Sequence, residues 1–167
     1  ITRFEIAELC IGLKKPFITS LRRVEKVKDI IIKVYTDTVL VGYGEACAVT
    51  AITGATNESV IKELCENIFP SLIGQEIDVH DIFERLHRSS SNSEAKACVD
   101  IALYDLLAKD KGVPLYAYLG AQTNTLDTDL TISVGSTEKM HADTVEALDS
   151  GFRSLKIKLD ADVEMNI

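Results

Sequence analysis

The first third of the chain alternates hydrophobic and polar positions, as half-buried β-strands do. The alternation covers residues 2–15, 29–37 and 39–49, and the second segment is rich in β-branched side chains. The second and third segments are separated only by the short polar break at 37–38, which predicts a hairpin. Residues 16–28 form a longer connection between the first and second segments, so we expect a functional loop there.

The middle third follows the helical repeat of three to four residues. Three segments show it, 58–69, 79–90 and 94–112, and the last is apolar enough to predict a buried helix. Pro114 should begin one more short helical turn, and Gly120 should end it. The expected N-terminal caps of the first two helices are Asn57 and Asp78, and Ser93 is expected to open the third.

The last part of the chain predicts a strand at 126–135, a helix at 136–151 and a strand at 152–159. A strand, helix and strand with short connections form a βαβ unit, which needs parallel strands and a right-handed crossover. Residues 160–167 should begin the next helix. Because two parallel strands cannot bury both of their faces, we expect this sequence to be a piece of a longer chain, or else to pair with another chain.

The composition and charge of the chain disfavour some classes of binding partner. Hydrophobic residues make up 46% and charged residues 26%, typical of a globular protein, and the formal charge of −8 disfavours nucleic acid as a partner. No run approaches the ~18 apolar residues of a membrane span, so we expect no membrane partner and a cytoplasmic location. The cysteines lie in apolar stretches and are expected to be buried, reduced thiols; they are Cys10, Cys47, Cys65 and Cys98.

The segment LKIKL at 155–159 carries the most specific chemistry. Lys156 and Lys158 share one face of the predicted strand, and the apolar residues share the other. Two lysines on a strand commonly form a solvated edge that discourages edge pairing. The alternative is a general base, because a neighbouring ammonium group favours the neutral amine of its partner.

Several longer motifs resemble the enolase superfamily, in its muconate-lactonizing branch. IALYDLLAKDKGVPLYAYLG at 101–120, TISVGS at 131–136 and the K-x-K strand carry this resemblance. Within the branch, the sequence is most similar to dipeptide epimerases that interconvert L-Ala-D-Glu and L-Ala-L-Glu. The segments at 14–34 and 51–56 resemble the capping loop and the second specificity loop of those enzymes.

The resemblance implies an α+β capping domain over residues 1–121, built from a three-stranded antiparallel sheet and helices. Residues 122–167 would then be the first two β/α elements of a TIM-type barrel, which is truncated here. A complete barrel takes roughly 200 residues or more, whereas only about 45 follow Gly120.

The resemblance also implies residue roles. Lys158 matches the acid/base that removes and returns the α-proton of the substrate, and Lys156 matches the lysine that contacts the substrate carboxylate. Thr131 matches a substrate-contacting position, and Arg22 matches the arginine that pairs with the glutamate side chain. Residues 53–54 belong to the loop expected to cover the site.

The implied reaction is a Mg²⁺-assisted 1,1-proton transfer on a dipeptide, a small-molecule substrate. The Mg²⁺ ligands and the opposing lysine lie on later barrel strands in this family, beyond Ile167, so we expect the present chain alone to be inactive. Two other interpretations remain open: a muconate cycloisomerase or o-succinylbenzoate synthase of the same superfamily, and a non-catalytic α+β module that docks on a partner chain. A homo-oligomer is also possible.

Overall fold

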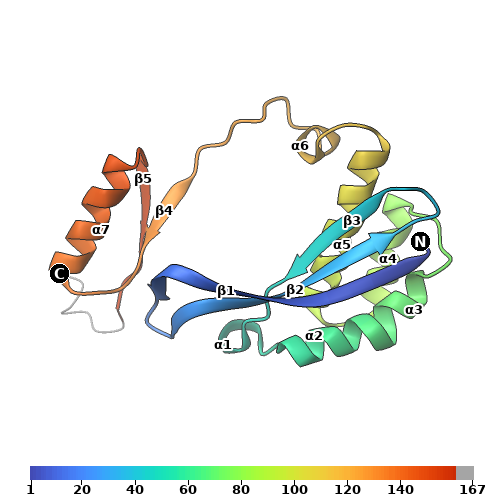
Figure 1. The fold of residues 1–167 in the computed structure, drawn as a ribbon, viewed down its shortest axis with the longest axis horizontal. Helices are drawn as coiled ribbons and strands as arrows, with labels where there is room; N and C mark the ends of the chain where they lie inside the picture. The colour runs from blue at the N-terminus through green and yellow to red at the C-terminus, as the bar shows by residue number, and fades with distance from the viewer. Residues whose placement is uncertain (161–167) are drawn as a thin grey trace. The chain divides into compact units, whose positions relative to one another are not determined.

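The computed structural model describes residues 1–160, and these form two compact units (Figure 1). The first unit comprises Ile1–Ile11 and Val27–Asn124. The second comprises Gly12–Lys26 and the described residues from Thr125 onward. None of the described helices has the length and apolar character that crossing a membrane requires. Most of the helix expected at 160–167 lies outside the described residues.

A three-stranded antiparallel sheet organises the first unit, as the family resemblance implied, and the parts of β1 and β2 that lie within Gly12–Lys26 belong to the second unit. Its strands are β1 (Arg3–Ile18), β2 (Arg23–Tyr35) and β3 (Val41–Ala46), in the order β1-β2-β3. One face of β2 carries Ile30, Ile32 and Val34, and all three side chains are fully buried. The β-branched residues of this segment therefore form the centre of the core.

Helices cover this buried face (Figure 1). Residues 57–72 form one nearly continuous helical run, in which five residues have π-helical hydrogen bonding, and the segment 93–110 forms the longest helix. The helices of the first unit are α1 (Thr50–Thr53), α2 (Asn57–Glu63), the π-helix η1 (Leu64–Ile68), α3 (Phe69–Leu72), α4 (Val79–Ser89), α5 (Ser93–Asp110) and α6 (Leu115–Tyr118).

Helix α5 packs directly on β3, because two glycines of the strand remove the side chains that would keep them apart. A Cβ atom on Gly44 would lie 1.9 Å from the carbonyl oxygen of Cys98. A Cβ atom on Gly42 would lie 2.2 Å from the carbonyl oxygen of Ala102. Only glycine permits this close approach of strand and helix.

Two polar side chains of α5 bond to the backbone of the edge strand β3. The carboxylate of Asp105 accepts a hydrogen bond from the Tyr43 N–H at 2.9 Å. The ammonium of Lys109 donates to the Val41 carbonyl at 2.7 Å and pairs with Asp105 at 2.6 Å. These contacts satisfy backbone groups that an edge strand otherwise leaves unpaired.

The second unit contains the predicted βαβ unit. It consists of β4 (Asp129–Ile132), α7 (Thr137–Asp149) and β5 (Ser154–Ile157), with β4 and β5 parallel (Figure 1). The helix begins where the Ser136 side chain accepts a hydrogen bond from the Lys139 N–H. Its buried Ala147 and the buried Ile132 of β4 form the interior of the unit.

Three expectations about local structure were wrong. The connection at 16–28 is mostly strand, since β1 continues to Ile18 and β2 begins at Arg23, which leaves only a short turn. Its Phe, Ile and Val residues favour extended structure, and Pro16 is tolerated because β1 is an edge strand.

The N-cap of α2 is Thr56 rather than Asn57. The Thr56 hydroxyl accepts a hydrogen bond from the Ser59 N–H, and the Ser59 hydroxyl accepts one from the Thr56 N–H, which forms a capping box. Helix α5 begins at Ser93, as predicted, and its cap is Asn92, whose side chain accepts a hydrogen bond from the Ala95 N–H. The Asp78 cap of α4 is confirmed, because its carboxylate accepts from the Asp81 N–H at 3.3 Å.

The cysteines were also mispredicted. Only Cys98 is buried, and burial raises the pKa of its thiol to about 12. Cys10, Cys47 and Cys65 are exposed. Cys47 and Cys65 each follow a buried residue, Ala46 and Leu64, which faces the core in their place, whereas Cys10 lies in a stretch of β1 that is exposed as a whole.

Candidate functional site

The two lysines of the K-x-K segment lie at the end of β5. The parallel register places Lys156 directly opposite Thr131 of β4. Lys158 follows the last strand residue, and its N–H donates to the Ile132 carbonyl at 3.0 Å, which continues the ladder. Thr131, Lys156 and Lys158 therefore project from the same face of the two-stranded sheet.

The other face of these strands is the one that α7 covers. Ile132 alternates with Thr131 along β4 and is 2% exposed, and Ala147 of α7 is 1% exposed. Lys156 is exposed, whereas Thr131 and Lys158 are half-buried. The lysines thus lie on the face turned away from the helix, which is the inner face in a barrel.

Arg22 lies in the turn that joins β1 and β2. The Thr19 N–H donates to the Arg22 carbonyl at 2.9 Å, and the Arg22 N–H donates to the Thr19 carbonyl at 3.3 Å. The Thr19 hydroxyl also accepts from the Leu21 and Arg22 N–H groups, both at 3.2 Å. This side-chain capping holds the turn in one conformation.

The same turn is bonded to the carboxyl end of β4. The Ile18 carbonyl, one residue before the turn, accepts a hydrogen bond from the Val134 N–H at 3.2 Å. Parallel strands end at the same edge of a sheet, so the turn lies at the edge where β5 ends and Lys158 follows. The structure therefore gathers all four predicted site residues in the second unit.

A pocket of about 600 Å³ lies between the hairpin segment 15–23, β4 and α7. Thr131 lines it, and so does Arg23, the neighbour of the predicted Arg22. The α7 residues that line it share one side of the helix, because they are spaced by three or four positions. Arg22, Lys156 and Lys158 are not among its lining residues, so this pocket is beside the lysine face rather than over it.

Charged side chains close one side of this pocket. The ammonium of Lys15 lies 2.5 Å from Glu146 and 3.6 Å from Asp143. These partners raise the pKa of Lys15, mainly through the hydrogen bond to Glu146. The hydrogen bond from Lys139, 2.5 Å away, is the main reason that the pKa of Asp143 is lowered.

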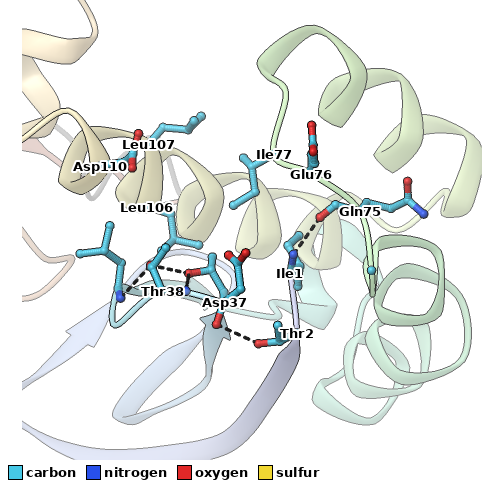
Figure 2. Close-up of a pocket in the computed structure, with 13 residues that line it drawn as sticks. Ile1, Thr2, Asp37, Thr38, Gln75, Glu76, Ile77, Leu106, Leu107 and Asp110 are labelled. Atoms are coloured by element: carbon cyan, nitrogen blue, oxygen red, sulfur yellow. Dashed lines mark hydrogen bonds between the residues drawn. The ribbon is translucent and has the colours of Figure 1, made fainter.

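A second pocket, of about 380 Å³, belongs to the first unit (Figure 2). Asp37, Glu76 and Asp110 supply carboxylates to it, and the Ile1 ammonium donates to the Gln75 carbonyl at 2.7 Å. None of the predicted site residues lines it. It therefore contains no lysine that could serve as the general base.

The second specificity loop was expected at 51–56, and Thr53 and Gly54 belong to it. Thr53 ends α1 and Gly54 caps this helix with a left-handed φ of 79°, which favours glycine. Both residues belong to the first unit and both are exposed.

Residues 1–160 contain no side-chain cluster suited to a metal ion. No cluster of three or more His, Cys, Asp or Glu side chains in this range is placed to hold an ion. The described residues thus do not fit a complete Mg²⁺ site.

Two residues of the site region were not identified from the sequence. Thr19 caps the turn of Arg22, and Ser133 accepts a hydrogen bond from the Ile18 N–H at 3.2 Å. The Thr-Ser-Leu-Arg order is a recognisable signal for a side-chain-capped turn. For Ser133 the only signal is that it lies two positions after Thr131, on the same face.

Comparison with known proteins agrees with this geometry. Residues 3–120 match the N-terminal domain of the mandelate racemase / muconate lactonizing enzyme family. The L-Ala-D/L-Glu epimerase of Clostridium acetobutylicum is 42% identical over 164 residues, which are 97% of this chain and 46% of the epimerase.

Solved structures show the same relationship. The substrate-liganded L-Ala-D/L-Glu epimerase from Bacillus subtilis superposes with a TM-score of 0.95 at 36% identity, over 99% of this chain and 47% of that one. A dipeptide epimerase from Enterococcus faecalis, complexed with Mg and the dipeptide L-Leu-L-Tyr, superposes with a TM-score of 0.94 at 30% identity. The match covers 99% of this chain and 47% of that one. The chain thus spans about half the length of the proteins that it matches.

The family match agrees with the three-stranded sheet, its helices and the parallel strands that follow them. The chain therefore belongs to the enolase superfamily, in the mandelate racemase / muconate lactonizing enzyme family, and contains the N-terminal domain of that family.

Proposed function

We propose that this chain is part of a dipeptide epimerase that acts on L-Ala-D/L-Glu. The observation that carries the proposal is the shared face of Thr131, Lys156 and Lys158 at the carboxyl ends of two parallel strands. The names of the similar proteins give the substrate class, since those from C. acetobutylicum and B. subtilis are L-Ala-D/L-Glu epimerases.

In the proposed reaction, Lys158 exchanges the α-proton of the glutamate residue on one face of the substrate. The proton beside a carboxylate is very weakly acidic, so the charge that develops on the carboxylate must be stabilised. Lys156 lies two residues earlier on the same face and can place its ammonium against that carboxylate. Return of a proton from the opposite side inverts the centre.

Arg22 would select the substrate. Its turn lies at the strand edge where Lys158 follows β5, and an arginine there can pair with the side-chain carboxylate of glutamate. A substrate without that carboxylate gains nothing from Arg22. This difference separates a Glu-specific epimerase from a cycloisomerase or o-succinylbenzoate synthase of the same superfamily.

We further propose that residues 1–121 form the capping domain and residues 122–167 the start of the barrel. The match over residues 3–120 supports this boundary. Mg²⁺ is the proposed cofactor, because the similar E. faecalis enzyme was solved with Mg and a dipeptide. The described residues supply no complete set of ligands for it.

The test is proton exchange. The native polypeptide is incubated with L-Ala-L-Glu in D₂O, and ¹H NMR follows loss of the glutamate α-proton and appearance of the L-Ala-D-Glu diastereomer. Both signals should change in the wild type. The proposal would be overturned if the protein turned over a cycloisomerase substrate but exchanged the α-proton of neither L-Ala-L-Glu nor any other dipeptide.

A further inference from the structure

We infer that Ser133 is a positioning residue, which anchors the Arg22 turn to the end of β4 and so sets the affinity for the glutamate side chain. The inference rests on the proposed function for its substrate, but the anchor itself is read from hydrogen bonds within the second unit. Ser133 accepts from the Ile18 N–H at 3.2 Å, and Val134 donates to the Ile18 carbonyl at 3.2 Å.

The hairpin geometry explains why Ile18 needs these partners. Thr19 and Arg22 exchange both backbone hydrogen bonds, so they form a hydrogen-bonded pair of the antiparallel ladder. Such pairs alternate with non-hydrogen-bonded ones. The neighbouring pair, Ile18 and Arg23, is therefore non-hydrogen-bonded, and the N–H and carbonyl of Ile18 point away from β2.

Residues 133 and 134 satisfy both of these outward groups. The Ile18 carbonyl accepts a hydrogen bond from the backbone N–H of Val134, a donor that any residue except proline supplies. The Ile18 N–H donates to the side-chain hydroxyl of Ser133, so this bond depends on the identity of residue 133. Both Ile18 and Ser133 are half-buried, so water replaces the lost acceptor only in part.

Ser133 also connects two parts of the proposed site. It lies two positions after Thr131, on the same strand face, and the parallel register extended by one residue places it opposite Lys158. Its bond to Ile18 is one residue away from the Thr19–Arg22 pair. A shift of the hairpin relative to β4 would thus move Arg22 while leaving Lys156 and Lys158 in place.

The ion pairs of Lys15 are a second connection between the hairpin and the βαβ unit. Lys15 contacts Glu146 and Asp143 of α7, but its side chain is 57% exposed. Exposed pairs of this kind contribute little and are screened by salt. They hold the hairpin loosely, whereas the Ser133 bond fixes the turn itself.

The test uses Ser133→Ala in the native polypeptide, with two readouts. Amide hydrogen exchange of Ile18 should accelerate by roughly fivefold, the effect of one lost hydrogen bond. The KM for L-Ala-L-Glu should rise by a similar factor with kcat nearly unchanged, and the KM for a dipeptide without a side-chain carboxylate should not rise. Ser133→Thr keeps the hydroxyl and should restore both values.

A matched control is Ser154→Ala, the same chemical change at the exposed start of β5, which should alter neither readout. If Ile18 exchange is unchanged in Ser133→Ala, the anchor is absent and the inference is overturned. If exchange accelerates but kcat falls at constant KM, Ser133 acts on the lysines instead, and the inference is again overturned.

A double variant tests whether Ser133 acts on substrate binding through Arg22. When Arg22→Ala is already present, Ser133→Ala should raise KM no further, because the two residues act through one contact. Absence of epimerase turnover in the wild type would overturn the proposed function alone, since Ile18 exchange still reports whether the anchor exists.

Discussion

Thr131 and Lys156 are direct cross-strand neighbours, paired Cα to Cα in the parallel register of β4 and β5. Their side chains project from the face opposite to the one that α7 buries through Ile132 and Ala147. A threonine hydroxyl and an ammonium group are thus placed side by side, with Lys158 just beyond them. This arrangement makes the strand ends a testable site.

Substitution of Lys158 by methionine removes the proposed acid/base while keeping the length and apolar stem of the side chain. We expect the rate of α-proton exchange in L-Ala-L-Glu to fall at least about 100-fold, the usual contribution of general acid–base catalysis. ¹H NMR in D₂O measures this rate. Lys111→Met, at the exposed C-cap of α5, is the control and should leave it unchanged; exchange at the wild-type rate in Lys158→Met would exclude the role.

Substitution of Arg22 by alanine removes the proposed contact to the glutamate side chain. We expect KM for L-Ala-L-Glu to rise roughly tenfold or more, since charge-assisted hydrogen bonds are worth about 1.5–3 kcal/mol. Steady-state kinetics with dipeptides that have or lack a side-chain carboxylate measure the effect.

The control for Arg22 is its neighbour, Arg23→Ala. Arg23 pairs with Glu25 at 3.0 Å and is exposed, so its loss should change KM less than twofold. Equal effects of the two variants on both substrates would show that the turn supplies only general positive charge.

Substitution of Gly44 by alanine tests the packing of α5 on β3. The added Cβ would lie 1.9 Å from the Cys98 carbonyl oxygen, so strand and helix must separate. We expect the free energy of unfolding to fall by about 2–3 kcal/mol or more, measured by urea denaturation. Gly12→Ala is the matched control, because nothing lies within 4 Å of its Cβ position; a stable Gly44→Ala protein would contradict the packing described.

The Asp29–Glu45 pair predicts a pH dependence. Asp29 is 8% exposed, and its Oδ1 has no donor among the described residues. The hydrogen bond to Asp29, and then burial, raise the pKa of Glu45, because only the protonated carboxyl can donate. The folded state therefore holds this proton more tightly, and its stabilisation is complete below about pH 4.5 and is lost as pH rises through the raised pKa.

Glu45→Gln places a permanent amide donor at this position. We expect the variant to gain stability relative to the wild type as pH rises, by less than about 1 kcal/mol because Glu45 is exposed to solvent. Urea denaturation between about pH 4 and about pH 8 measures the difference. A stability difference between Glu45→Gln and the wild type that stays constant across this pH range would contradict the shared proton.

Local sequence patterns predicted much of the fold because they report the burial of single elements. The β-branched run at 29–37 becomes the central strand β2, and the apolar segment after residue 93 becomes the buried helix α5. The strand, helix and strand that end the chain follow from the same periodicities, since one face of each element must be buried. The period-two alternation likewise placed both lysines on one face.

Other features depend on contacts between distant segments, and no local pattern contains them. Ile18 and Ser133 are 115 positions apart, so their bond, and the short turn that it holds, appear only when the hairpin meets β4. The exposed cysteines show the same limit, because an apolar neighbourhood does not say which residue of it faces the core. By itself the sequence determined most of the elements and which face of β5 carries the lysines. The tertiary structure alone decided which residues meet at the end of β4, because register and hairpin placement are fixed by long-range hydrogen bonds and packing.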